Sequence, residues 1–222
     1  MNEQKICIIG DGLAGLTTAA ILSKENVKID LYSSKKKKNS FLDTRTTAIS
    51  ESNYLYIKDS LSISNKNFFW PCKEINLFFE DKKIITNFFN FKEKNKKLMY
   101  IFQNKDLKKK LDKLIKTTNK IKIIKKNIKD VDSEQGFILF DKKKKFYDLI
   151  ILCIGGQSKL YSNIEEGRSI EKNYKEIALT AIIKHNGKVK NVSQFFLKEG
   201  PLAVLPFEKK KFSTVWSISS DF

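Results

Sequence analysis

Three glycines with a fixed spacing, Gly10-x-Gly12-x-x-Gly15, limit the folds open to this chain more than any other feature. They follow the short apolar run at residues 5–9, which is typical of a buried parallel strand, and they precede residues 16–24, which predict a helix. In this setting Gly10 permits a tight turn after the strand, Gly12 lets a phosphate approach the backbone, and Gly15 allows the helix to pack closely on the strand. The pattern predicts a turn that binds a diphosphate; a glycine-rich turn without a ligand is the alternative.

The helix after this turn begins with N–H groups that have no partner within the helix and that carry a partial positive charge. We therefore expect Leu13 and Ala14 to contribute backbone N–H groups to the site. A second strand, predicted at residues 27–32, would normally be followed by a carboxylate that binds a ribose. The chain has Ser33 there, and Asp30 falls on the opposite face of the strand. We expect Ser33 to make a neutral ribose contact, weaker by about 1–2 kcal/mol.

The composition is strongly basic, with 43 lysine and arginine residues against 25 acidic residues and a formal net charge of +18. Only Arg45 and Arg168 are arginines, whereas proteins that bind nucleic acid use arginine freely because its planar group pairs with phosphates and bases. We therefore expect no nucleic-acid partner. A solvated lysine surface and an affinity for an anionic membrane surface remain the two interpretations of the charge.

Cysteine usage and hydropathy indicate the compartment. No apolar run approaches the roughly 18–20 residues that span a bilayer, and we expect no secretory signal. Cys7, Cys72 and Cys153 are an odd number without metal-type spacing, which predicts reduced thiols in a cytoplasmic protein and no metal site. The only histidine, His185, lies in a polar turn, and we expect it at the surface rather than in a catalytic role.

The rest of the chain alternates between α/β patterns and runs of short antiparallel strands, which predicts an α/β protein with two interleaved domains. We expect a Rossmann-like nucleotide-binding domain at residues 1–65 and 98–174, and a β-sheet domain at residues 66–97 and 175–222. Two local features are also predicted, a helix at residues 47–61 and a hairpin turn at the lysine run 142–145.

Three later segments resemble the ubiquinone-biosynthesis hydroxylases, which are FAD-dependent aromatic monooxygenases with the para-hydroxybenzoate hydroxylase fold. Residues 42–49 are similar to the family's Asp-x-Arg-x-x-Ala-Ile/Leu stretch, and residues 98–107 are similar to a strand that leads into a helix. The most specific segment, residues 200–206, is similar to the family's Gly-Pro-Leu-Ala-x-Leu-Pro strand, and Val215-Trp216 to the Val-Trp that follows it. The resemblance covers essentially the whole chain in the family's order and spacing.

This resemblance implies a Rossmann-like FAD-binding domain interleaved with an antiparallel β substrate domain. It implies FAD as the cofactor, NAD(P)H as the reductant, and hydroxylation of a polyprenylated phenol by O2. The three motif glycines would hold the FAD diphosphate, and Arg45 would lie near the phosphates or the ribityl chain. A surface ion pair of Arg45 with Asp43 or Glu51 is the alternative. No acid–base residue is nominated; four residues would lie on the substrate side of the flavin, namely Pro201, Leu202, Leu205 and Pro206.

The chain departs from the family in two places. The middle motif, usually Asp-Gly after an apolar strand, corresponds to Ile154-Gly155, so Gly155 is kept as a cofactor contact while the acid is lost. The family has a second Gly-Asp motif after the Val-Trp segment, whereas this sequence stops at Phe222. We therefore expect a C-terminally truncated form of the fold. A truncated or decayed flavin-binding module without turnover, and another FAD- or NAD-linked oxidoreductase, remain as alternatives.

The expected partners follow from the same resemblance. A polyprenylated substrate is lipid-like, and the chain is basic. Together these features favour a cytoplasmic protein that associates peripherally with the inner membrane or with a ubiquinone-biosynthesis complex.

Overall fold

The computed structural model describes residues 3–34, 43–63, 68–155, 160 and 172–221. The chain divides into two compact units, residues 1–41 with 107–171 and residues 42–106 with 172–222. The units are interleaved in the sequence, but residues 42–65 and 98–106, which we expected in the nucleotide-binding domain, belong to the second unit. The reason is that strands from both segments pair with each other there, as described below.

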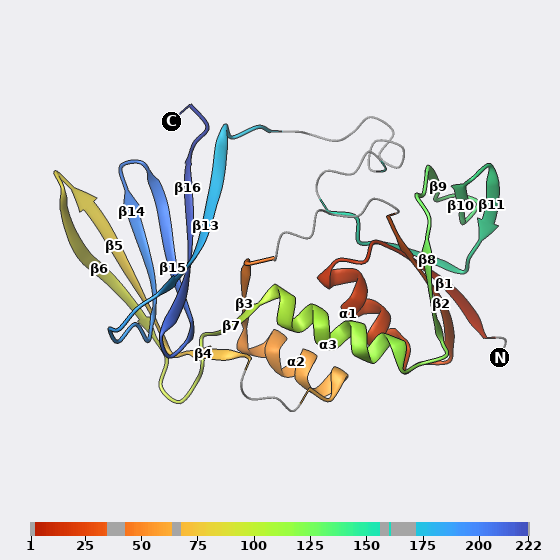
Figure 1. Cartoon of the computed structure of the whole chain (residues 1–222), viewed down its shortest axis with the longest axis horizontal. Helices are drawn as coiled ribbons and strands as arrows, with labels where there is room; N and C mark the ends of the chain where they lie inside the picture. Colours follow the sequence, from red (N-terminus) through yellow and green to blue (C-terminus); the bar gives the residue numbers. More distant parts are fainter. Residues whose placement is uncertain (1–2, 35–42, 64–67, 156–159, 161–171, 222) are drawn as a thin grey trace. The chain divides into compact units, whose positions relative to one another are not determined.

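The first unit is built on a parallel sheet in the order β12-β1-β2-β8. Its strands are β1 (Gln4–Ile9), β2 (Val27–Ser33), β8 (Ile121–Lys125) and β12 (Leu149–Leu152). Helices α1 (Leu13–Leu22) and α3 (Asn104–Lys116) lie on one side of this sheet in Figure 1. A three-stranded antiparallel sheet lies on the other side, formed by β9 (Asp130–Asp132), β10 (Phe137–Phe140) and β11 (Lys143–Phe146).

The two central strands, β1 and β2, are buried on both faces over most of their length, whereas the edge strand β8 alternates with exposed lysines. Alternation along the strands divides their side chains between two cores. Cys7 and Tyr32 pack with Val131 and Ile138 of the three-stranded sheet. The intervening residues, such as Ile8 and its neighbours on β2, point to the opposite face and are fully buried as well. The predicted β-α-β unit is therefore confirmed in its order and its burial.

The second unit contains a six-stranded sheet in the order β13-β16-β15-β14-β5-β6, antiparallel except between β14 and β5. Its strands are β5 (Glu74–Asp81), β6 (Ile84–Lys92), β13 (Glu176–Lys184), β14 (Val192–Leu197), β15 (Gly200–Glu208) and β16 (Lys211–Ser219). A small sheet in the order β3-β7-β4 and one helix complete the unit, with β3 (Thr46–Ser50), α2 (Glu51–Leu61), β4 (Trp70–Cys72) and β7 (Met99–Gln103).

Two local predictions are wrong. The helix expected at residues 47–61 begins only at Glu51, because the β-branched residues before it pair with β7, and because Ser50 caps the helix by accepting a hydrogen bond from the Asn53 N–H. The lysine run expected to form a turn is mostly strand β11, and the turn occupies Asp141 and Lys142 instead. Lysine stems pack along apolar surface in that strand, and Lys144 lies 4.0 Å from the centroid of the Phe137 ring.

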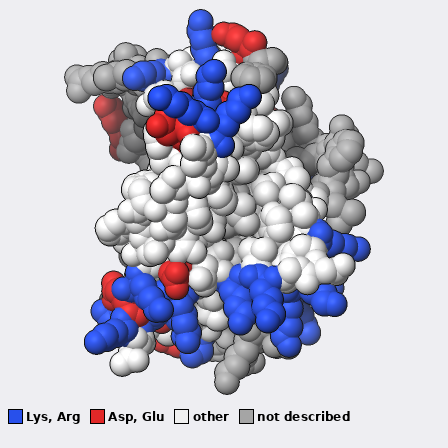
Figure 2. Space-filling model, turned by 90° about the vertical axis from the view of Figure 1, so that its left-hand side faces the viewer, with Lys and Arg blue, Asp and Glu red and all other residues white. Residues whose placement is uncertain are grey.

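The six-stranded sheet has one packed face and one open face. Val192 and Phe207 on the packed face contact Cys72 and Ile101 of the small sheet. Figure 2 views the molecule from the side of the six-stranded sheet and shows a broad uncharged surface with lysines gathered at its upper and lower ends. The edge strand β6 is exposed along its whole length. Among the helices that the structure describes, none has the length and apolar character needed to cross a membrane.

Candidate functional site

The glycine motif lies where β1 ends and α1 begins. Gly10 has a φ of 115°, and its N–H donates to the Tyr32 carbonyl oxygen at the end of β2, over 2.9 Å. A Cβ on Gly10 would lie 2.2 Å from the carbonyl oxygen of Cys153, and a Cβ on Gly15 would lie 1.9 Å from the carbonyl oxygen of Gly10. Both positions therefore require glycine because backbone packs directly on backbone, as the motif predicts.

Gly12 is glycine for a different reason. It is the N-cap of α1, with an ordinary φ of −72°, and a Cβ there would meet no atom within 4 Å. The fold itself therefore does not require glycine at this position. The missing side chain leaves free space in front of the first turn of α1, where Leu13 is half-buried and Ala14 is exposed. Since Gly12 offers no capping side chain, the N–H groups of this turn are left for another acceptor.

A pocket of about 580 Å³ lies in front of this turn. Its walls come from residues 9–12, 32–34, 126–128 and 153–155, together with Leu160. The first two segments and the last follow β1, β2 and β12, and residues 126–128 follow β8, so the pocket lies at the carboxyl ends of all four parallel strands. Open α/β sheets bind their ligands at this edge.

The residues around the pocket fit the diphosphate of FAD. Gly12 lines the pocket and leaves space there, and the first turn of α1, with its partial positive charge and without a side-chain cap from Gly12, begins at that point. Asp11 also lines the pocket. Lys108 lies beside the turn rather than in the pocket lining: its Nζ donates to the Asp11 carbonyl oxygen over 3.5 Å and also pairs with Asp112 over 3.4 Å. The sequence alone does not indicate Lys108, since only the packing of α3 brings it to the glycine turn.

The ribose end of the pocket is neutral or basic rather than acidic. Ser33 is 6% exposed and lines the pocket at the end of β2. Ser34, beside it, donates a hydrogen bond to Asn127 Oδ1 over 3.2 Å, and Lys126 forms an ion pair with Asp141. Lys126 and Asn127 follow β8, and sequence reasoning missed them. They could have been found from the rule that the carboxyl ends of parallel strands meet at one edge.

Asp30 lies away from the pocket, as strand alternation predicts. Its carboxylate accepts a hydrogen bond from the Tyr147 hydroxyl over 2.7 Å and pairs with Lys145 of β11. The Tyr147 and Tyr32 hydroxyls are 2.8 Å apart. Burial and the hydrogen bond to Tyr32 raise the pKa of Tyr147. Asp30 therefore joins the three-stranded sheet to the parallel sheet and does not replace the missing ribose carboxylate.

Cys7 lies within the same buried region of the parallel sheet. Burial, together with the negative charge of Asp30, raises the pKa of its thiol from 9.0 to about 12. Cys7, Cys72 and Cys153 are all free thiols. A thiol that stays protonated at neutral pH is a poor nucleophile, so Cys7 contributes packing rather than chemistry.

Gly155 lines the pocket directly after β12. Its φ is 70°, and a Cβ there would meet no atom within 4 Å. Its position is compatible with the predicted cofactor contact. The neighbouring residues of the middle motif, 156–158, lie outside the described residues.

Arg45 belongs to the second unit, whereas the glycine pocket lies in the first. Its guanidinium makes two hydrogen bonds of 2.8 Å to the carboxylate of Asp43, and this pairing raises the pKa of Arg45. The ion pair with Asp43 named above as the alternative is thus present. The role of Arg45 at the flavin stays a prediction.

The four predicted substrate-side residues lie on β15 but not on one face of it. Alternation places Pro201 and Leu205 on one face and Leu202 on the other. Leu205 is half-buried and packs with the core shared with the small sheet, and Pro206 is fully buried. Pro201 is exposed and Leu202 is half-buried, and these two keep access to solvent. The substrate-side role of the four residues stays a prediction.

His185 differs from the expectation of an exposed histidine. Its ring centroid lies 5.4 Å from that of Phe212, and both ring nitrogens are buried without a hydrogen-bond partner among the described residues. The ring therefore packs on the end of the six-stranded sheet, which the polar residues around it in the sequence do not indicate.

No protein-family model matches the chain, and no curated protein sequence matches it. Several solved structures share its fold. PqsL of Pseudomonas aeruginosa, described as a probable FAD-dependent monooxygenase, is similar with a TM-score of 0.75 and 10% identity over 99% of this chain and 62% of that one. The tetrameric form of 2-methyl-3-hydroxypyridine-5-carboxylic acid oxygenase is similar with a TM-score of 0.74 and 15% identity over 100% of this chain and 60% of that one.

CtdE, solved in complex with FAD, is similar with a TM-score of 0.68 and 16% identity over 99% of this chain and 60% of that one. The chain thus spans about 60% of the length of these structures. Over that part, it has the α/β fold of the para-hydroxybenzoate hydroxylase-like FAD monooxygenases.

Proposed function

We propose that the chain binds FAD in the pocket at the glycine turn, as part of a monooxygenase that hydroxylates a polyprenylated phenol in ubiquinone biosynthesis with NAD(P)H as reductant. The observation that carries the proposal is Gly12. Its missing side chain leaves open a space that the fold does not fill, in front of the N–H groups of α1. Free space in front of the N-terminus of a helix is suited to binding a diphosphate, because the N–H groups there can donate hydrogen bonds to its oxygens.

FAD, when bound, would supply the redox chemistry with NAD(P)H and O2. The chain's own residues would bind and orient it. The N–H groups of Leu13 and Ala14, in the first turn of α1 next to the pocket residue Gly12, would receive the diphosphate. Gly155, which lines the pocket after β12, would allow close approach. Ser33 and Asn127 would offer neutral hydrogen bonds at the ribose end.

The substrate class rests on the resemblance of residues 200–206 and 215–216 to the ubiquinone-biosynthesis hydroxylases. Pro201 and Leu202 support it, because both are apolar and accessible on β15. Peripheral association with the inner membrane is part of the same proposal, and the lysines at both ends of the six-stranded sheet support it.

The test is a titration of the purified chain with FAD, followed by the quenching of flavin fluorescence. We expect saturable binding that ADP displaces, and we expect Gly12→Ala to weaken it by at least about tenfold, which is about 1.4 kcal/mol. Gly187→Ala is the matched control, because its new Cβ would also meet only an ordinary contact, 3.8 Å from His185 Nδ1. Absence of FAD binding, or equal effects of the two substitutions, would contradict the proposal.

A second measurement separates the proposed enzyme from a flavin-binding module without turnover. Oxidation of NAD(P)H is followed in the presence of FAD, with and without a polyprenylated phenol. Stimulation by the phenol supports the monooxygenase. Tight FAD binding without any NAD(P)H oxidation favours the module.

A further inference from the structure

A second pocket, of about 600 Å³, lies within the second unit and shares no residue with the glycine pocket. Three segments form it, namely β4 with Lys73, the connection between β13 and β14 at residues 187–191, and Lys209 in the turn between β15 and β16. One hydrogen bond joins the ends of two of these segments, from the His185 N–H to the Lys210 carbonyl oxygen over 3.0 Å. Its volume is in the range of pockets that bind small molecules.

The charged side chains that line this pocket are all lysines, Lys73, Lys188, Lys190 and Lys209. Each is exposed, and within the described part of the chain none of them forms an ion pair. Lys97 lies beside Lys73, and partial desolvation together with the charge of Lys73 lowers its pKa. Glu51 partly offsets the charge at Lys97, but the four pocket lysines have no ion-pair partner among the described residues. Like charges gathered in this way repel one another, which a bound anion would relieve.

The floor of the pocket is apolar. Trp70 and Pro71 belong to β4, which is fixed by its pairing with β7, and Val189 comes from the opposite wall. Trp70 is half-buried and also packs against the core of the second unit. A ring held in this way offers an apolar surface beside the four ammonium groups. The pocket is thus suited to a ligand with a negative group at one end and an apolar group at the other.

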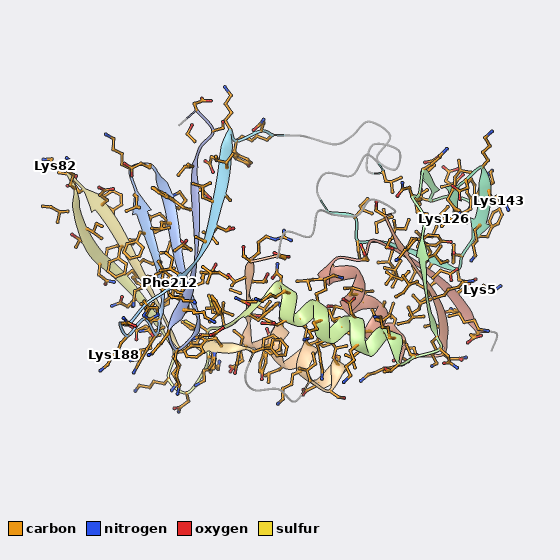
Figure 3. All side chains as sticks on the ribbon, viewed as in Figure 1. Lys5, Lys82, Lys126, Lys143, Lys188 and Phe212 are labelled. Atoms are coloured by element: carbon orange, nitrogen blue, oxygen red, sulfur yellow. The ribbon has the colours of Figure 1, made fainter. Side chains whose placement is uncertain are left out.

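We propose that this pocket binds a phosphate ester that carries an apolar group. Four lysines supply enough charge for a dianionic phosphate, and Trp70 with Val189 would contact the apolar group. Such an ester could be a phospholipid head group at a membrane or a soluble prenyl or acyl phosphate. Figure 3 places Lys188 at the lower end of the six-stranded sheet, and Figure 2 shows lysines gathered at that end next to the uncharged surface.

The proposal is tested by calorimetric titration of the full chain with 1-lauroyl-lysophosphatidate below its micelle concentration. We expect saturable binding, and binding of inorganic phosphate at least about tenfold weaker because it lacks the apolar contact. The double substitution Lys188→Glu/Lys190→Glu should weaken lysophosphatidate binding by at least about tenfold. Lys209→Glu, on another wall, should act in the same direction and covers the case in which the double variant does not fold.

Lys82→Glu/Lys83→Glu is the matched control, because it makes the same charge change on the same sheet, and Figure 3 shows Lys82 at the opposite end from Lys188. We expect less than about a twofold effect on lysophosphatidate binding from this control. Failure of the unaltered chain to bind, or an equal loss in the pocket variants and the control, would overturn the proposal.

The source of the ester is identified by sedimentation with phosphatidylcholine vesicles that contain or lack phosphatidate. Sedimentation that requires phosphatidate, and that the Lys188→Glu/Lys190→Glu chain loses, assigns the pocket to a lipid head group. Lysophosphatidate binding without vesicle binding assigns it to a soluble phosphate ester. Neither result depends on FAD, so the outcome is independent of the proposed cofactor site.

Discussion

The two pockets have nearly the same volume, about 580 and 600 Å³, but they are built from different parts of the polypeptide. The glycine pocket is formed largely by backbone at the ends of parallel strands, where Gly10 and Gly15 allow segments to approach closely. In the lysine pocket the charged groups are exposed lysine side chains outside the strands, set beside Trp70 and Pro71 of β4. The fold of the first unit therefore depends on residues of the glycine pocket, whereas the fold of the second unit does not depend on the lysines of the lysine pocket.

This difference determines how each site responds to substitution. Removing a loop lysine leaves the backbone where it was, because the side chain is exposed and unpaired within the described residues. Adding one methyl group at Gly10 or Gly15 forces backbone atoms apart, whereas at Gly12 it meets no atom within 4 Å. The contrast can be measured by comparing how much substitutions in each pocket change the free energy of unfolding.

The largest effect is expected for Gly15→Ala. Its Cβ would lie 1.9 Å from the Gly10 carbonyl oxygen, so β1 and α1 must separate, and we expect a loss of about 3 kcal/mol in the free energy of unfolding. Gly12→Ala has no such contact and should change it by less than about 1 kcal/mol. Urea unfolding of both variants provides the comparison. A Gly15→Ala protein as stable as the original would show that this pocket is not tied to the fold.

The next effect is the pH dependence of the free energy of unfolding that arises from Cys7, a buried residue of β1. In the folded chain the pKa of Cys7 is about 12, against 9.0 for an ordinary thiol, so the folded state keeps a proton that the unfolded state loses. Stability should therefore fall as the pH rises above 9, by about 1.4 kcal/mol between pH 8 and pH 10. Urea unfolding at both pH values should show a correspondingly smaller fall for Cys7→Ala. An identical fall in both proteins would mean that Cys7 ionises freely in the folded state.

The smallest effect is expected in the lysine pocket. Lys188→Ala/Lys190→Ala removes two exposed like charges, and we expect the free energy of unfolding to change by no more than about 0.5 kcal/mol, with any change toward greater stability. Thermal unfolding at low and at high salt measures it. A loss larger than about 1 kcal/mol would show that these lysines hold the loop in place and would remove the contrast between the two pockets.

The glycine turn, the first two strands and the helix between them could be predicted because each depends on residues close in sequence. The departures occurred where pairing with another strand, distant for Thr46–Ser50 and neighbouring for the lysine run, decided the outcome. Thr46 to Ser50 form a strand because β7 provides a partner, and the lysines at 143–145 do so because β10 provides one. Neither preference is visible in a short stretch of sequence.

The residues of the candidate site also divide into those that the sequence predicted and those that only the packing revealed. Gly10, Gly12 and Ser33 were predicted from the motif, and the structure brings all three to one pocket. Lys126 in the pocket and Lys108 beside the glycine turn were not predicted, because β8 and α3 bring them there from more than ninety residues along the chain from Gly12. The substrate-side segment on β15 was predicted as a strand, but its two faces and the burial of Pro206 depend on neighbouring strands and on the small sheet.

By itself, the sequence determined the strand–turn–helix in which a diphosphate would lie, because steric limits on Gly10 and Gly15 act through the local backbone. Only the tertiary structure decided which side chains surround that turn, and that four lysines and Trp70 line one pocket. Such groupings arise when separate segments pack, and the free energy of packing depends on partners that no single segment contains.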